Sequence, residues 1–162
     1  MVAGRIKELA AVVISGGAGN DGDLVALDAT GKIDVSVMPA GIGQNTGSGL
    51  TSEALAANDL VNVYDNAGTA NVRKADATAE GKEANAFVKQ AYTSGQTATY
   101  YLSGNVMTGL TGLVAGRRYL HTTAGLSTGT SPSTAGNVVQ KIGDALSATS
   151  IAFEPEEPIT LA

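Results

Sequence analysis

A glycine-rich loop near the N-terminus carries the first residues that could do chemistry. Gly17-x-Gly19-x-x-Gly22 follows an apolar stretch and matches the dinucleotide-binding fingerprint letter for letter. That fingerprint binds a pyrophosphate only when a helix follows and its N–H groups face the phosphates. Here Asp21 and Asp23 bring negative charge to the loop, and the residues after them favour a strand. We therefore expect no nucleotide site.

The same loop clusters oxygen ligands. Residues 20–23 read Asn-Asp-Gly-Asp, as in a calcium loop. An EF-hand requires alternating ligands and a glutamate at its twelfth position, which this segment lacks. An Asx-type turn is the favoured interpretation, and weak ion binding is the alternative.

The remaining candidates for catalysis are a histidine and three acids. His121 is the only histidine, so paired-histidine metal sites are excluded and any Ser-His-Asp triad would have to use it. It lies in an expected strand, where a structural or surface role is favoured over that of a base. Glu154, Glu156 and Glu157 could supply a carboxylate pair for glycoside hydrolysis, but acids between prolines near a terminus are usually solvated. We expect no enzyme, no cofactor and no metal.

The net charge and the composition argue against several classes of binding partner. The net charge is −5 with only ten basic residues, which argues against binding a phosphate backbone. Arg73-Lys74 and Arg117-Arg118 are the adjacent basic pairs, and each fits a solvated turn or a contact with an acidic neighbour. No apolar run approaches the ~20 residues that span a bilayer, and the run at 9–14 is thin for a signal peptide. We expect no nucleic acid, no membrane and synthesis in the cytoplasm.

The elements that would position these residues are short strands. The chain has 21 glycines among many Ser, Thr and Asn residues, which favours numerous tight turns. A hairpin is expected over 23–38, with its turn at 28–31. The same pattern recurs with a strand at 58–63 and a turn at 65–68. Further strands are expected at 86–92, 97–102, 118–122, 137–142 and 149–153, and residues 159–161 are either a last edge strand or a tail. Such spacing predicts an all-β fold, a small β-barrel or β-sandwich with few or no helices.

Three regions are expected along the chain. Residues 1–20 form an extended N-terminal arm that ends in the glycine-rich loop. Residues 21–50 hold the first hairpin and a glycine-rich linker, since 40–51 contains four glycines among polar residues. Residues 51–162 form the main β-domain.

The core is expected to be thin, because much of the 43% hydrophobic content is alanine. A thin core favours an oligomer, since association stabilises the folded form by mass action.

Tyr100, Tyr101 and Tyr119 fit core packing, a subunit interface or, least well, glycan contact. Adjacent residues of a strand face opposite ways, so we expect one of Tyr100 and Tyr101 in the core and the other exposed. The seven aromatic residues are Tyr64, Phe87, Tyr92, Tyr100, Tyr101, Tyr119 and Phe153.

Two stretches carry a resemblance to a known family. They are D-G-D-L-V-A-L-D-A-T-G-K-I-D at 21–34, and G-R-R-Y-L at 116–120 followed by V-V-Q-K-I-G-D-A-L-S-A-T at 138–149. Between them, A-N-D-L-V-N-V-Y-D at 57–65 and A-N-A-F-V at 84–88 are similar to the same group. The sequence resembles head decoration (capsid cement) proteins of tailed bacteriophages, which share a β-module with phage fibre proteins.

The resemblance implies a non-enzymatic structural protein of the virion. Such a protein is a homotrimer that binds the major capsid protein on the outside of the head and stabilises the shell. The alternative is a trimeric tail or head fibre module that binds a host receptor or glycan. On the decoration interpretation, we expect the arm to contact the capsid or a neighbouring subunit. The expected interface residues are Ile6, Leu9, Val12, Val13, Tyr101 and Tyr119.

Overall fold

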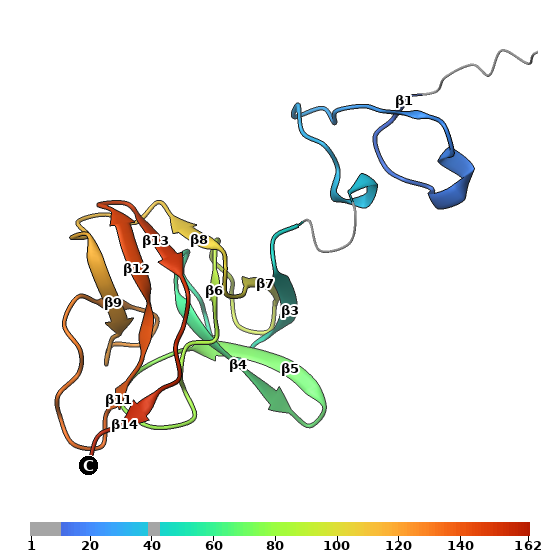
Figure 1. The fold of residues 1–162 in the computed structure, drawn as a ribbon. Coiled ribbons are helices and arrows are strands. Elements are labelled where there is room, and N and C mark those ends of the chain that lie inside the picture. The colour runs from blue at the N-terminus through green and yellow to red at the C-terminus, as the bar shows by residue number, and fades with distance from the viewer. Residues whose placement is uncertain (1–10, 39–42) are drawn as a thin grey trace, which may run out of the picture. The chain divides into compact units, whose positions relative to one another are not determined.

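The structure, a computed structural model, describes residues 11–38 and 43–162 and divides the chain into two compact units. The first unit is Met1–Gly43 and the second is Gln44–Ala162. Each is described by itself. The fold is all-β: the described helical segments are two short 3-10 turns, and the remaining elements are strands (Figure 1).

The first unit contains two short strands and both 3-10 turns. These elements are β1 (Ala11–Val12), η1 (Gly17–Asn20), β2 (Leu24–Val25) and η2 (Val35–Val37). β1 pairs with β2 in parallel. The hairpin expected over 23–38 is therefore wrong, although its turn forms, with Gly31 N–H donating to Asp28 O at 3.0 Å. The alternation of valines at 35 and 37 suggested a strand, but the turn at Asp34 leads into η2 instead.

The second unit begins with a closed five-stranded barrel. Its strands follow the order β3-β5-β4-β6-β7, and β7 returns to β3. β3 is parallel to β5, and the other neighbours are antiparallel. The strands are β3 (Thr46–Thr51), β4 (Leu60–Asn66), β5 (Thr69–Lys74), β6 (Ala86–Val88) and β7 (Thr97–Tyr101).

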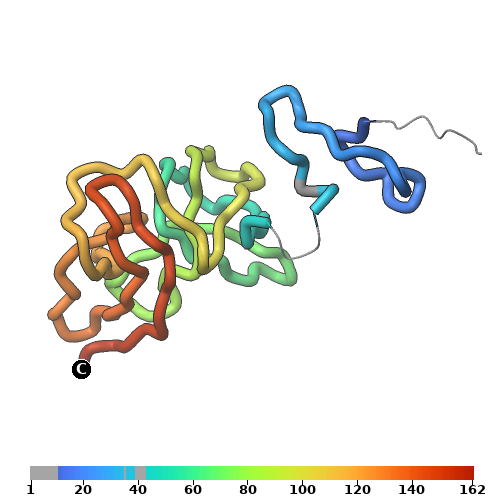
Figure 2. The backbone as a smooth tube through the Cα atoms, turned by 45° about the horizontal axis from the view of Figure 1, so that its top comes forward, coloured from blue at the N-terminus to red at the C-terminus, as the bar shows by residue number. Residues whose placement is uncertain are grey.

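The rest of the second unit is an antiparallel sheet with the order β10-β9-β12-β13-β8, and a small β11-β14 pair. The sheet strands are β8 (Val106–Thr108), β9 (Gly116–Leu120), β10 (Ser127–Thr128), β12 (Lys141–Ser147) and β13 (Ser150–Phe153). The small pair is β11 (Val138–Val139) and β14 (Ile159–Thr160). The sheet and the barrel lie side by side in both views (Figures 1 and 2).

Two hydrophobic clusters follow from the alternation of side chains along the barrel strands. On β6, Ala86 and Val88 belong to one cluster, while Phe87 between them belongs to the other. The first of these clusters gathers inward-facing barrel residues. The second joins Phe87 to residues of the five-stranded sheet such as Ile142 and Phe153, so it fills the space between barrel and sheet. Both faces of the barrel wall at β6 are therefore buried.

The glycine-rich segment expected to be a linker is a barrel strand. Residues 46–51 form β3, so the linker prediction is wrong at these positions. A Cβ on Gly47 would lie 2.5 Å from the Tyr100 ring, and a Cβ on Gly49 would lie 2.7 Å from Ala70 O. These glycines let neighbouring groups approach the strand closely, which composition alone cannot distinguish from flexibility.

The second predicted hairpin is confirmed. Asn66 of β4 pairs with Thr69 of β5, leaving Ala67 and Gly68 as a two-residue loop. Both have positive φ, at 54° and 84°, as a type I′ turn requires. Asp65 Oδ1 accepts a hydrogen bond from Gly68 N–H at 3.1 Å. The aspartate and the glycine that predicted the turn thus form it.

Buried polar side chains hold the loops of the second unit. Asp76, 7% exposed, accepts hydrogen bonds from the backbone and hydroxyl of Thr78, and Lys82 Nζ lies 3.3 Å from its Oδ2. Burial opposes ionisation of this carboxyl, but the Thr78 hydrogen bonds and the Lys82 charge outweigh it and lower its pKa below the ordinary value. The loop that joins β5 to β6 is therefore tied together by an ionised group.

Candidate docking surface of the first unit

The first unit has no buried residue among residues 11–38 for which burial is described. Large apolar side chains there lie open, with exposed fractions between 36% and 67%. They are Val13, Ile14, Leu24, Val25, Leu27 and Ile33. We call these six residues the apolar surface of the first unit. In the described part of the second unit the same number of large apolar residues is exposed, but they are spread from Leu50 to Ile159.

Local hydrogen bonds, rather than a core, shape the first unit. Asp28 Oδ1 accepts from Thr30 N–H at 2.8 Å and from Lys32 N–H at 2.9 Å. The Lys32 N–H contributes most to holding the pKa of the Asp28 carboxyl below its ordinary value. Ser15 N–H donates to Ser36 Oγ at 2.9 Å, which connects segments 21 residues apart. Such polar links set the backbone path, while the large apolar side chains stay exposed.

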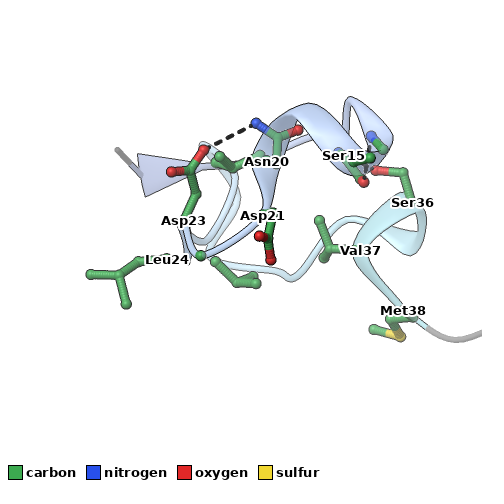
Figure 3. Close-up of a pocket in the computed structure, with 13 residues that line it drawn as sticks. Ser15, Asn20, Asp21, Asp23, Leu24, Ser36, Val37 and Met38 are labelled. Carbon is green, nitrogen blue, oxygen red and sulfur yellow. Dashed lines mark hydrogen bonds between the residues drawn. The ribbon is translucent and has the colours of Figure 1, made fainter. Parts of the chain in front are cut away.

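An open pocket of about 520 Å³ lies within the same unit (Figure 3). Its large apolar lining comes from β1, β2, η2 and Met38, and its polar lining comes from residues 20–23 together with Ser15 and Ser36. Asn20 Nδ2 donates to Asp23 Oδ2 at 3.2 Å, while Leu24 and Val37 contribute apolar walls (Figure 3). The combination of small residues, acids and branched apolar side chains fits a protein surface better than a phosphate, which requires positive charge.

The fingerprint loop does not continue into the helix that a dinucleotide site requires. Residues Gly17–Asn20 form a four-residue 3-10 turn, and the chain then enters β2. Asn20 Oδ1 accepts from Gly16 N–H at 2.5 Å, so the asparagine side chain closes the loop on itself. Within residues 11–38 and 43–162, no group of three or more His, Cys, Asp or Glu side chains is arranged to hold a metal ion.

Of the six predicted interface residues, two lie outside the described residues, two lie in the first unit and two lie in the second unit. Ile6 and Leu9 lie outside the described residues. Val12 is half-buried and lines the pocket, while Val13 is 36% exposed beside it. Sequence reasoning named these positions but missed the exposed apolar residues from Ile14 to Ile33, because it assigned the segment after 20 to a hairpin.

The predicted tyrosines lie in the second unit and are half-buried. Tyr101 stacks on Phe87 with ring centroids 5.4 Å apart, and Lys89 Nζ lies 4.1 Å from its ring centroid. Tyr100 packs on the barrel cluster instead, so neither of the adjacent pair is exposed and that expectation is wrong. Tyr119 lies on β9, opposite Thr128 and Lys141. All three rings are half-covered within the chain itself.

His121 and the glutamates take ordinary structural positions. His121 Nδ1 accepts a hydrogen bond from Thr123 N–H at 2.6 Å, which supports the turn after β9. Glu156 Oε1 lies 3.1 Å from Lys141 Nζ. Lys141 also meets Asp144, and first that carboxylate and then Glu156 raise the pKa of the lysine.

Sequence reasoning missed another catalytic pattern, Gly125-x-Ser127-x-Gly129, which has the spacing of a hydrolase nucleophile elbow. That motif requires a strand-turn-helix context. Ser127 instead lies in the two-residue strand β10, and its Oγ accepts a hydrogen bond from Arg118 Nη2 at 3.2 Å. The context is that of a sheet edge rather than of a nucleophile.

No protein-family model matches the sequence, and no curated protein matches it. Within the described residues, none of the helical segments is long and apolar enough to cross a membrane. The candidate site is therefore defined by its own geometry: among residues 11–38, none of those with described burial is buried, and six large apolar side chains are exposed.

Proposed function

We propose that this protein is a structural component of a tailed-phage virion that binds the outside of the capsid as a decoration protein and stabilises the shell. The observation that carries the proposal is the apolar surface of the first unit. Residues 11–38 expose six large apolar side chains, and none of those with described burial is buried, which suits docking on another protein. The resemblance of residues 21–34 and 116–149 to head decoration proteins indicates which protein that is, the major capsid protein.

The energetics fit many modest contacts. Fully burying a Val, Leu or Ile side chain contributes about 1.5–3 kcal/mol, and these six are already partly covered. Completing their burial contributes about 1 kcal/mol each, on the order of 6 kcal/mol per subunit before the cost of association. One such contact is weak. Three in a homotrimer, with the all-β second unit as the scaffold, would bind a symmetric shell by avidity.

The first experiment locates the protein on intact particles from its source with antibody labelling and negative-stain electron microscopy. Label spread over the head supports decoration. Label confined to the tail or its tip favours the alternative, a fibre module that binds a host receptor or glycan. Absence of label from every particle overturns the assignment to the virion.

The second experiment tests the docking surface with matched variants on shells that lack the protein. Leu24→Asp places a charge on the apolar surface at a residue 58% exposed, so the fold should tolerate it and attachment should fall at least tenfold. Val114→Asp, at a residue 79% exposed in the second unit, is the control and should attach normally. The reverse result would mean that the β-domain docks and the first unit at most locks neighbouring subunits.

A further inference from the structure

A second, smaller pocket lies in the second unit, between the loop after β8 and the turn after β9. Its volume is about 230 Å³, below the ~300–1,000 Å³ of drug-sized ligand sites, so it suits a short ligand or a single side chain. Leu60 and Met107, both buried, belong to its lining and to the main cluster. Leu110 and Leu113 line it and are half-buried, and Leu126 lines it and is 51% exposed.

One cation lines this apolar pocket. Arg118 of β9 is half-buried, and its Nη2 donates to Ser127 O at 3.0 Å and to Ser127 Oγ at 3.2 Å. Its Nε is buried and has no hydrogen-bond partner among residues 11–38 and 43–162. None of the ion pairs among the described residues includes Arg118. Asp59, which lies against Gly125 of the same pocket, pairs with Lys74 at 3.4 Å instead.

A half-buried guanidinium with an unpartnered Nε, at the wall of a largely apolar pocket, favours an anion. A buried donor without a partner is unfavourable, and more so when the group is charged. Burial lowers the pKa of Arg118, as expected for a cation that lacks a counter-ion. Ser127 Oγ accepts from Arg118 and keeps its own hydrogen to donate. The pocket thus offers leucine and methionine walls with the Arg118 and Ser127 donors, beside the polar side chains of Asn58 and Thr111. Such a lining is the complement of a carboxylate on a short aliphatic chain.

We propose that this pocket, lined by Arg118, Ser127, Met107 and the leucines at 110, 113 and 126, binds an aliphatic carboxylate. The carboxylate lies against the guanidinium and the branched aliphatic part fills the cavity. The ligand is either a free small acid or an acidic group presented by a partner protein. This site is separate from the apolar surface of the first unit and does not depend on the decoration role.

The test is a titration of the full-length protein with 4-methylpentanoate, followed by NMR of the Met107, Leu110 and Leu113 methyl groups. We expect saturable shifts with a Kd on the order of a millimolar. The neutral analogue 4-methylpentanamide should bind about 10–100-fold more weakly, because it loses the charge-assisted hydrogen bonds. Equal binding of the amide, or no saturation by the acid at 50 mM, overturns the proposal without any mutation.

Variants at two adjacent arginines supply the matched comparison. Arg118→Met keeps an unbranched side chain and removes the charge, and it should abolish the preference for the acid over the amide. Arg117→Met, at the exposed neighbour on the same strand, should retain that preference. A preference that survives Arg118→Met overturns the role of this arginine.

Two further ligands test the class of the ligand and distinguish a free acid from a carboxylate presented by a partner protein. Inorganic phosphate that shifts the same methyl groups with equal affinity would identify a general anion site and overturn the aliphatic class. A leucine-ended peptide that binds at least tenfold more tightly than 4-methylpentanoate would identify the carboxylate as a partner's C-terminus rather than a free acid. The converse order would identify a free acid.

Discussion

Replacing Gln140 with alanine should destabilise the second unit far more than a surface glutamine does. Gln140 is 4% exposed and lies between β11 and β12. Its Oε1 accepts from Ala84 N–H at 2.8 Å, and its Nε2 donates to Ala84 O at 2.9 Å. The same Nε2 donates to Glu156 O at 3.2 Å. One amide thus serves as the strand partner of a backbone 56 residues away.

The magnitude follows from the groups that alanine leaves behind. Ala84 is 1% exposed, so both its N–H and its C=O lose their partner in a buried position. Each unsatisfied group costs about 1–3 kcal/mol, and water entering the gap recovers part of that. We expect a loss of about 3 kcal/mol in the free energy of unfolding. The segment around Glu156 should also loosen.

Urea denaturation followed by circular dichroism measures the loss, and hydrogen exchange of the Ala84 amide measures its local part. Gln90→Ala is the control, because Gln90 is exposed and donates only to Tyr92 Oη at 3.0 Å, so it should cost less than about 0.5 kcal/mol. Gln140→Glu keeps the acceptor but can donate only when protonated, so its deficit relative to wild type should shrink in acid. A loss for Gln140→Ala no larger than that for Gln90→Ala would refute the reasoning.

Two further predictions concern the backbone and a buried acid. Gly143→Ala should lower the free energy of unfolding by about 3 kcal/mol or more, because φ at this residue is 141° and the new Cβ would lie 1.9 Å from Ala152 O. A melting temperature within 2 °C of wild type would contradict this. Asp76→Asn should destabilise at neutral pH. The folded pKa of Asp76 is lowered, so its ionised form stabilises the fold above its unfolded pKa of ~3.9. That contribution disappears as the pH falls through the folded pKa. The deficit of the variant, measured by urea denaturation between pH 7 and 2.5, should therefore shrink below about pH 4, and a pH-independent deficit would show that Asp76 stabilises by packing alone.

The sequence predicted the local turns correctly where the turn residues form a well-defined motif. Asp65 and Gly68 predicted a two-residue turn, and the strands on either side pair in register around it. The same type of signal at Asp28 and Gly31 predicted a hairpin that does not form, although its turn does. A turn motif determines the path of about four residues. It does not determine which strand the flanking residues pair with, and β2 pairs with β1 instead.

Glycine content was the least informative signal. The segment that holds Gly47 and Gly49 has the composition of a linker, yet it closes the barrel between β5 and β7. The physical reason is contact with residues distant in sequence, since Tyr100 and Ala70 occupy the space that side chains at 47 and 49 would need. The candidate docking surface was missed in part for a similar reason. Leu24 pairs with Ala11 across β1 and β2 and is still 58% exposed, because exposure depends on which side chains from elsewhere pack over it and not on strand pairing.

By itself, the sequence determined the all-β class, the positions of most strands in the second unit and the turn at 65–68, because these depend on the alternation and turn residues of short segments. Only the tertiary structure decided that β3 completes a barrel, that the described residues of the first unit are not buried, and that no ion pair among the described residues includes Arg118. Each of these depends on which groups meet across tens of residues. Neither composition nor local spacing encodes that meeting, because it is set by the packing of the whole unit.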